Sequence, residues 1–167
     1  MSVAGSGIAC VASLFVVLIA MAPPARAGEI PAALTGAWEL DVSKSDELPE
    51  DSIVFDSAPA SVLARDRWKV LGAETLRIDG ESDAIGIQYD GSHYDDVMLG
   101  ELETGGWTVQ ASVARRDRLV VRSRRAGVTG VERYSVTESG NLLKIRISIK
   151  GLAELVAVTR TFRRVAE

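Results

Sequence analysis

Apolar and polar residues alternate through the segment from Gly106 to Arg164, and this alternation constrains the fold more than any other feature of the sequence. It is strict from Leu143 to Ile149, as expected for an extended strand with one buried and one solvated face. Residue types that favour turns separate this run from its neighbours. The pattern predicts five strands: Trp107–Ala114, Arg118–Arg125, Val131–Thr137, Leu142–Ile149 and Glu154–Arg163. Their connections are too short for parallel crossovers, so successive strands are expected to be antiparallel.

The N-terminal half adds further strands and one helix. Four strands are predicted, at Leu34–Asp41, Thr75–Asp79, Ala84–Tyr89 and Tyr94–Leu99. Between the first and the second, apolar residues at helical spacing predict a helix with Ser57 as its N-cap. The apolar stripe consists of Ala60, Leu63, Ala64, Trp68 and Leu71. This helix packs over one end of a barrel or acts as a lid at a ligand portal.

The predicted fold is therefore all-β, a single antiparallel meander closed into a β-barrel of roughly eight to ten strands with one short helix between the first and second strands. Closure is expected because a single sheet without a covering layer otherwise exposes its edge strands. A sandwich of two sheets is the alternative. The interior of such a barrel is either filled by side chains or holds one small ligand.

The first 27 residues have the pattern of a cleaved signal peptide. Ile8 to Ala22 is almost entirely apolar, and Ala25-Arg26-Ala27 has the small-x-small form of a cleavage site. We expect residues 1–27 to be removed, residues 28–167 to form the barrel domain, and the protein to be periplasmic or secreted, with no membrane span after cleavage. An uncleaved membrane anchor is the alternative. Cys10 is the single cysteine, so the mature chain has no disulfide and no cysteine-based metal site.

Charge is segregated along the chain. Residues 28–104 contain 18 acidic and 5 basic side chains, whereas residues 105–167 contain 5 acidic and 13 basic ones. The net charge of −4 argues against a nucleic-acid partner, and none is predicted. The densest basic run, from Arg115 to Arg125, is interpreted mainly as the solvated face of a strand whose charges pair with acidic rows across the sheet. The alternative is a patch for an anionic partner, such as a phosphorylated glycolipid or a nucleic acid.

Gly36-Ala37-Trp38 opens the first predicted strand, a helical segment and a meander follow it, and the last strand is rich in arginine. This layout resembles the lipocalin and calycin barrels. With Trp38–Asp41 and Lys44–Asp46, the chain is similar to the exported lipocalin-like proteins of bacteria. The resemblance implies that Trp38 closes one end of the barrel and that a last-strand arginine, among Arg160, Arg163 and Arg164, lies across its ring. Barrel closure is assigned to Gly36, Trp38, Arg160 and Arg163.

The same resemblance implies that the barrel binds a small hydrophobic or amphipathic ligand. The interior wall that would contact it consists of Trp38, Tyr89, Trp107, Val109, Leu119, Val121, Ile145 and Ile147. No cofactor or metal is predicted, because the chain has no phosphate-binding loop, dinucleotide fingerprint or zinc-ligand spacing.

Two other functions stay open. A solid barrel could act through its surface, as an inhibitor or an envelope interaction factor whose acidic segments Glu47–Asp51 and Asp95–Glu103 meet a basic target. A hydrolase or isomerase could use His93, the single histidine, with its acidic neighbours. Ser92 is a poor nucleophile for it, because adjacent residues in an extended segment point apart. A haem held by His93 is a further alternative. No catalysis is expected.

Overall fold

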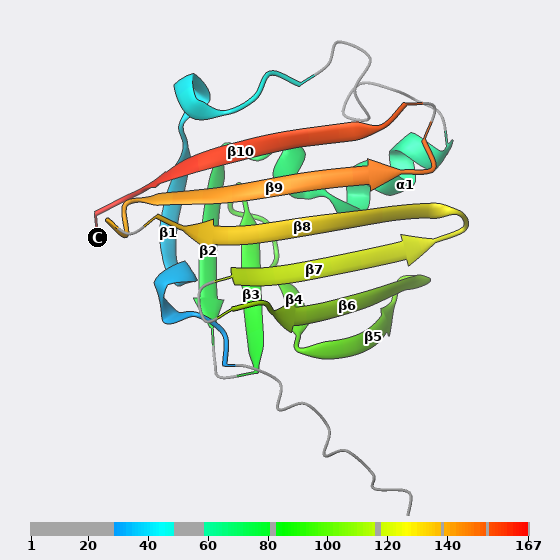
Figure 1. Ribbon diagram of the computed structural model, residues 1–167, viewed down its shortest axis with the longest axis horizontal. Helices are drawn as coiled ribbons and strands as arrows, with labels where there is room; N and C mark the ends of the chain where they lie inside the picture. Colours follow the sequence, from blue (N-terminus) through cyan, green and yellow to red (C-terminus); the bar gives the residue numbers. More distant parts are fainter. Residues whose placement is uncertain are drawn as a thin grey trace, which may run out of the picture.

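The structure is a computed structural model in which residues 29–48, 59–80, 83–115, 118–137, 139–152 and 154–166 are described. Within these ranges, ten strands form one antiparallel sheet in the spatial order β4-β3-β2-β1-β10-β9-β8-β7-β6-β5 (Figure 1). They are β1 (Gly36–Leu40), β2 (Thr75–Gly80), β3 (Ala84–Tyr89), β4 (Asp95–Met98), β5 (Gly100–Thr104), β6 (Trp107–Val113), β7 (Arg118–Arg125), β8 (Val128–Val136), β9 (Leu142–Lys150) and β10 (Val156–Arg164). Short helical segments are η1 (Ala32–Leu34), η2 (Val42–Lys44), α1 (Pro59–Arg67) and η3 (Lys69–Leu71).

The sheet curls into a nearly closed barrel. The first and last strands pair, with Trp38 opposite Arg164 and Leu40 opposite Phe162, which confirms the predicted meander and its closure. The two ends of the strand order, β4 and β5, follow one another in the chain without forming a ladder in the described part. There the only bridge recorded outside the named strands joins Leu99 to Ala111. The barrel therefore has one seam, between β4 and β5.

The strand predictions are confirmed except at this seam. β5 was not predicted, because Gly100–Thr104 is exposed along its whole length and has no apolar alternation to reveal it. The predicted helix is shorter than expected: α1 ends at Arg67, and Trp68 leaves helical geometry at φ −108° and ψ 57° before η3 begins. The predicted N-cap Ser57 and the signal segment 1–27 lie outside the described residues.

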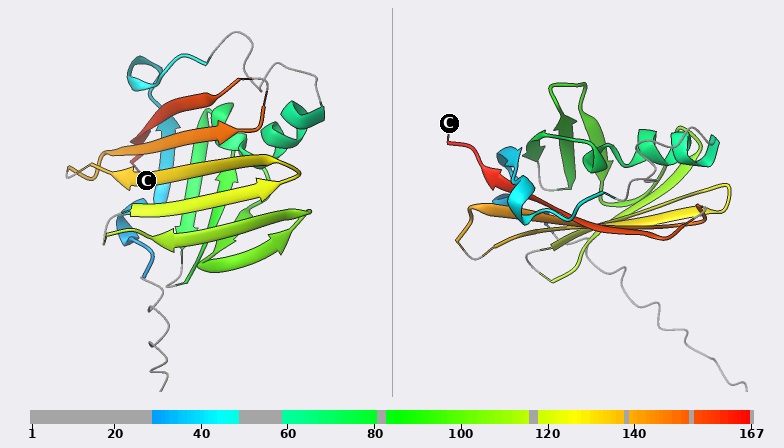
Figure 2. Two further views of the ribbon diagram at one scale, coloured as in Figure 1. Left: turned by 45° about the vertical axis from the view of Figure 1, so that its right-hand side comes forward. Right: turned by 90° about the horizontal axis from the view of Figure 1, so that it is seen from above.

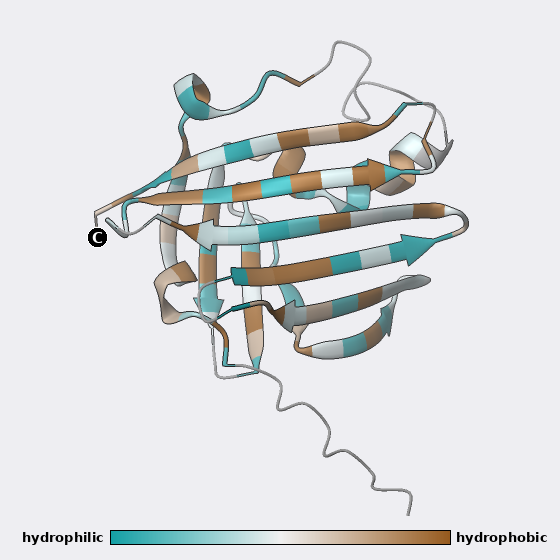
Figure 3. Cartoon of the chain, viewed as in Figure 1, coloured by the Kyte–Doolittle hydropathy of each residue, from teal (hydrophilic) through white to brown (hydrophobic). Residues whose placement is uncertain are grey.

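The core lies inside the barrel. Along β9 the buried row is Leu143, Ile145, Ile147 and Ile149, and the alternating bands along this strand are visible in Figure 3. Trp68, just after α1, is part of the buried core. Figure 2 shows α1 itself on the concave side of β8 and β9. The Trp68 ring packs edge to face on Trp107, with 5.3 Å between the ring centroids. It also lies over Gly130 on β8, where a Cβ atom would collide with the indole.

The opposite end of the barrel is closed by Trp38, which is 1% exposed and donates a hydrogen bond from Nε1 to the Leu34 carbonyl at 3.0 Å. The guanidinium of Arg164 lies 4.1 Å from the centre of the Trp38 ring. Gly36 has φ +135°, and a Cβ there would collide with the Arg164 guanidinium, so this position requires glycine.

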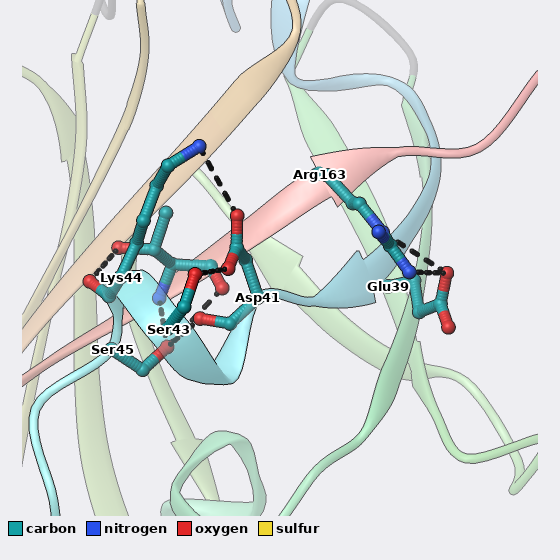
Figure 4. A network of polar contacts seen from close by, with 7 residues as sticks. Glu39, Asp41, Ser43, Lys44, Ser45 and Arg163 are labelled. Atoms are coloured by element: carbon teal, nitrogen blue, oxygen red, sulfur yellow. Dashed lines mark hydrogen bonds and ion pairs between the residues drawn. The ribbon is translucent and has the colours of Figure 1, made fainter.

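The assignment of Arg160 and Arg163 to this closure is wrong, because the stacking arginine is Arg164. Alternation along β10 places Arg164 on the inward row and Arg163 on the outward row. Arg163 instead pairs with Glu39 across the outer surface, at 3.0 Å (Figure 4). Arg160 shares the inward row with Arg164 but lies four residues, or about 13 Å, further along the strand.

The segment Lys44–Asp46 fastens η2 to the outer side of β10. Ser45 Oγ accepts a hydrogen bond from the Thr161 amide at 2.9 Å, and the Thr161 hydroxyl donates to the Lys44 carbonyl at 2.9 Å. The Asp46 carboxylate accepts a hydrogen bond from the Thr159 amide at 2.7 Å. Figure 4 shows the Asp41–Ser45 part of this network beside the Glu39–Arg163 pair. These residues therefore have a structural role at the first-to-last-strand junction.

Candidate ligand-binding site

The eight predicted wall residues are all buried and belong to one continuous core. They are Trp38, Tyr89, Trp107, Val109, Leu119, Val121, Ile145 and Ile147. They come from strands on both sides of the barrel, with Tyr89 on β3 and Ile145 on β9. That they line one interior follows from the fold, whereas their contact with a ligand stays a prediction.

Four polar or charged side chains share this interior, and sequence reasoning assigned none of them to the ligand-binding wall. Glu132 and Tyr134 lie on β8, Ser123 on β7 and Arg160 on β10, and all four are buried. The predicted strand at Val131–Thr137 has apolar residues on both of its rows, so the pattern did not reveal which row faces inward. For Arg160 a signal was present, because it alternates with Val158 and Phe162 on one row.

Arg160 is the least satisfied of these groups. It is 8% exposed, its Nε has no hydrogen-bond partner, and no acidic side chain pairs with it in the described part of the chain. Burial lowers the pKa of its guanidinium. A buried cation without a counter-ion is costly, since the interior replaces little of the hydration that the charge loses. Arg160 is therefore suited to an acidic group supplied from outside the chain.

Tyr134 lies on the same transverse row of the wall as Arg160. Ile145 on β9 pairs with Tyr134 on one side and with Arg160 on the other. The Cα atoms of Tyr134 and Arg160 are thus two strand spacings apart, roughly 10 Å. The two side chains therefore project from the same row of the inner wall, on either side of Ile145. A second buried donor without a partner, Trp68 Nε1, belongs to the same interior.

The other buried polar groups satisfy one another. Tyr134 donates a hydrogen bond to Glu132 Oε1 at 2.8 Å, and Arg67 Nε donates to Ser123 Oγ at 2.8 Å. Arg67 also lies 3.9 Å from Glu132 Oε2. Burial raises the pKa of Glu132, while the Arg67 charge and the Tyr134 hydrogen bond oppose this shift. Since Arg67 is the last residue of α1, this network ties the helix to the inner wall of β7 and β8.

A cavity of about 640 Å³ opens beside the seam between β4 and β5. Its apolar lining consists of Leu63, Met98, Leu102 and Trp107, and its charged lining includes Arg67, Lys69, Asp95 and Arg125. Lys69 Nζ and Asp95 are joined by an ion pair at 2.8 Å, which links η3 to β4 across the opening. Arg67 and Trp107 border both this cavity and the barrel interior, so the opening adjoins the candidate site.

Neither a protein-family model nor a curated protein sequence matches the chain significantly. Several solved structures do match it. A structure described as the REP1-NXSQ fatty acid transporter matches at a TM-score of 0.55 and 15% identity, over 81% of this chain and 98% of its own. The Schistosoma mansoni fatty acid binding protein in complex with arachidonic acid matches at 0.55 and 12% identity, over 81% and 98%. Zebrafish ileal bile acid-binding protein complexed with cholic acid matches at 0.51 and 16% identity, over 80% and 100%.

The fold is that of the calycin barrels. At these identities the likeness establishes the fold alone.

In this barrel, His93 lies away from the interior. It is exposed in the segment between β3 and β4, where the Ser92 hydroxyl donates to the His93 carbonyl. The nearby Asp90 carboxylate accepts hydrogen bonds from the amides of Glu74 and Thr75, at 2.9 and 2.8 Å. Asp90 thus braces the start of β2 and does not orient the histidine. Within the described ranges no three metal-binding side chains come together, and no helix is long and apolar enough to cross a membrane.

Proposed function

We propose that this barrel binds one small amphipathic molecule, with its apolar body against the aliphatic wall and its acidic head at Arg160. The observation that carries the proposal is the buried side chain of Arg160, whose Nε has no partner. An acid head would neutralise this charge and accept its hydrogen bonds in a low-dielectric setting, where charge-assisted bonds are strongest. A carboxylate matches a guanidinium in geometry as well as in charge, because both groups are planar and forked.

The Tyr134 hydroxyl adds a second contact for the head. Burial raises the pKa of Tyr134 well above its ordinary value, so the hydroxyl keeps its proton at neutral pH. It already donates a hydrogen bond to Glu132. Its oxygen can accept a hydrogen bond from the ligand head, or the hydroxyl can rotate and donate to that head instead. Similarity to structures named for fatty acid, arachidonic acid and cholic acid binding supports the proposal, since each named ligand is a carboxylic acid.

The ligand would pass through the opening beside the seam. Leu63, Met98, Leu102 and Trp107 give that opening an apolar lining, and α1 borders it. Passage requires Trp68 and α1 to move, because Trp68 is buried in the core and packs on Trp107, which lines the opening. The Arg67 contacts with Ser123 and Glu132 set how firmly the helix is held.

Paired ligands that differ only in the head group test this proposal. A long-chain fatty acid and the alcohol of the same length are titrated against the protein by calorimetry. We expect the acid to bind at least about ten-fold more tightly, as one charge-assisted hydrogen bond contributes about 1.5–3 kcal/mol. In Arg160→Gln the two ligands should bind equally. The matched control is Arg124→Gln, an exposed cation on the outer row of β7, which should leave the preference unchanged.

Two results would overturn the proposal. One is failure of both ligands to bind, and the other is an acid preference that survives in Arg160→Gln. Native mass spectrometry of the protein purified from its own cells provides an unbiased companion measurement, with an acidic lipid-like molecule expected to accompany the chain.

We also propose that the protein works outside the cytoplasm, on the strength of the apolar segment Ile8–Ala22 and the small-x-small motif that follows it. N-terminal sequencing of the protein from its native source is expected to begin at Gly28. A sequence that begins at the initiating methionine or its neighbour would contradict this location.

A further inference from the structure

Seven cations occupy the outward rows of three neighbouring strands, β7, β8 and β9. They are Arg118, Arg122, Arg124, Arg133, Lys144, Arg146 and Lys150, and we call this surface the basic face. Arg118 is half-buried and the other six are exposed. None of the seven forms an ion pair with another described residue. The outward rows of β6 to β10 carry no acidic side chain within the described ranges.

The strand register shows that these charges are not balanced across the sheet. Arg133 lies directly opposite Arg146, a pairing of like charges that destabilises a sheet. Arg118 lies opposite Ser135, and Arg124 lies opposite Thr129. The interpretation that these basic rows pair with acidic rows across the strands is therefore wrong. Because this cluster of cations is unfavourable for the isolated fold, we expect it to have a binding partner.

The basic face is a local property of an acidic protein. The chain has a net charge of −4, and its acids lie mostly in residues 28–104, which include β1 to β5. The face occupies the outer side of its strands, whereas α1 lies on the other side of them (Figures 1 and 2). A hollow of about 250 Å³ borders the face, and its lining includes Arg122, Arg124, Gln110 and Glu101.

We propose that the basic face docks the barrel on a membrane surface rich in anionic lipids. The cations are spread over the three strands. Arg133 and Arg146 are neighbours about 5 Å apart, whereas Arg118 and Lys144, like Arg124 and Lys150, are two strand spacings or about 10 Å apart. Charges spaced in this way can contact several small anionic groups at once. Anionic lipids diffuse within the membrane and can gather beneath these cations. Long arginine and lysine stems also reach a surface without insertion of the sheet.

Nucleic acid fits the basic face less well. The outward rows carry no aromatic side chain on which bases of a single strand could stack. The outer wall of a barrel is convex, so it would meet a rigid, convex duplex along a line and contact few phosphates. The acidic remainder of the chain would repel the rest of a long polyanion.

Vesicle binding tests the proposal. The full gene is expressed and the accumulated protein is mixed with vesicles of phosphatidylcholine alone, or with phosphatidylglycerol replacing about a third of the lipid. Any apolar N-terminal segment that is retained acts alike on both compositions, so the difference between them isolates charge. Each Lys or Arg at an anionic surface contributes about a five-fold gain in partition. We therefore expect the triple variant Arg122→Gln, Arg133→Gln, Arg146→Gln to lose roughly 100-fold of the binding to anionic vesicles.

The matched control removes three cations elsewhere, through Lys44→Gln, Arg65→Gln and Arg77→Gln, and should bind within about five-fold of the wild type. Raising the salt from about 0.05 M to about 0.5 M should release the wild type but barely affect any residual binding of the basic-face variant. Thermal melting checks folding, and the basic-face variant should melt no lower than the wild type because it removes the Arg133–Arg146 repulsion.

Three results would overturn the proposal. The first is equal binding to both vesicle types, and the second is an equal loss of binding in the two triple variants. The third is tighter binding to duplex DNA than to anionic vesicles at the same salt. The fatty acid titration is repeated on the basic-face variant, where affinity should be unchanged. Membrane docking is therefore tested separately from the proposed ligand site. Failure of the vesicle test alone would refute the docking proposal, and failure of the fatty acid titration alone would refute the proposed ligand site.

Discussion

The contact between Trp68 and Gly130 gives the sharpest test of how the interior is packed. A Cβ on Gly130 would collide with three atoms of the Trp68 indole, although the backbone of Gly130 has no positive φ that would itself disfavour alanine. In the absence of the indole, Gly→Ala in a strand is neutral or stabilises by about 0.4–1 kcal/mol through the unfolded chain. With the indole present, overpacking should destabilise Gly130→Ala by about 1–3 kcal/mol.

A double-mutant cycle measures this effect in isolation. Gly130→Ala is made in the wild type and in Trp68→Leu, where the smaller side chain leaves room for a methyl group. Urea unfolding should give a coupling free energy of about 1–3 kcal/mol between the two sites, and the melting temperature of Gly130→Ala should fall by roughly 3–12 °C. Near-ultraviolet circular dichroism should change as well, because Trp68 packs on Trp107 at 5.3 Å. Equal stability changes in the two backgrounds would refute the packing argument.

Three further perturbations test other contacts. In urea unfolding, Arg164→Ala should destabilise the fold by roughly 2–4 kcal/mol, since it removes the contact with Trp38 and three hydrogen bonds to carbonyls. Arg163→Ala removes only an exposed ion pair and should cost less than about 1 kcal/mol. Burial raises the pKa of Glu132, so the folded chain binds that proton more tightly than the unfolded chain, and the stability from this group falls as the pH rises above its ordinary value of 4.5. Glu132→Gln should remove this slope from melting curves recorded as a function of pH, and an unchanged slope would show that Glu132 is not its source. Lys69→Ala should change the stability by less than about 1 kcal/mol. It should speed the association of a fatty acid in stopped-flow mixing, because the ion pair between Lys69 and Asp95 spans the opening. An unchanged association rate would argue that the ligand enters by another route.

The sequence predicted the barrel because alternation in strands such as Leu142–Ile149 specifies both the strand and its buried face. It did not predict β5, whose residues are all exposed, or the early end of α1 at Arg67, which depends on where Trp68 packs. Alternation identifies apolar positions, so it located the apolar wall. It did not reveal Glu132, and Arg160 was assigned to barrel closure instead of to the wall in which it lies. The need for glycine at position 130 is set by a tryptophan 62 residues earlier in the chain, and nothing local to β8 signals it.

The two arginines on the inward row of β10 show why a structural role and a binding role can be told apart here. Arg164 is fully used by the protein: its guanidinium donates to the carbonyls of Ala33, Thr35 and Gly140 and covers Trp38. Arg160, on the same row, is more deeply buried and has an Nε without an acceptor. The fold thus accounts for one arginine and leaves the other unexplained. Because an uncompensated charge in a core lowers stability, Arg160→Gln should leave the barrel at least as stable as the wild type while it abolishes the preference for an acid, a combination that a purely structural arginine would not produce.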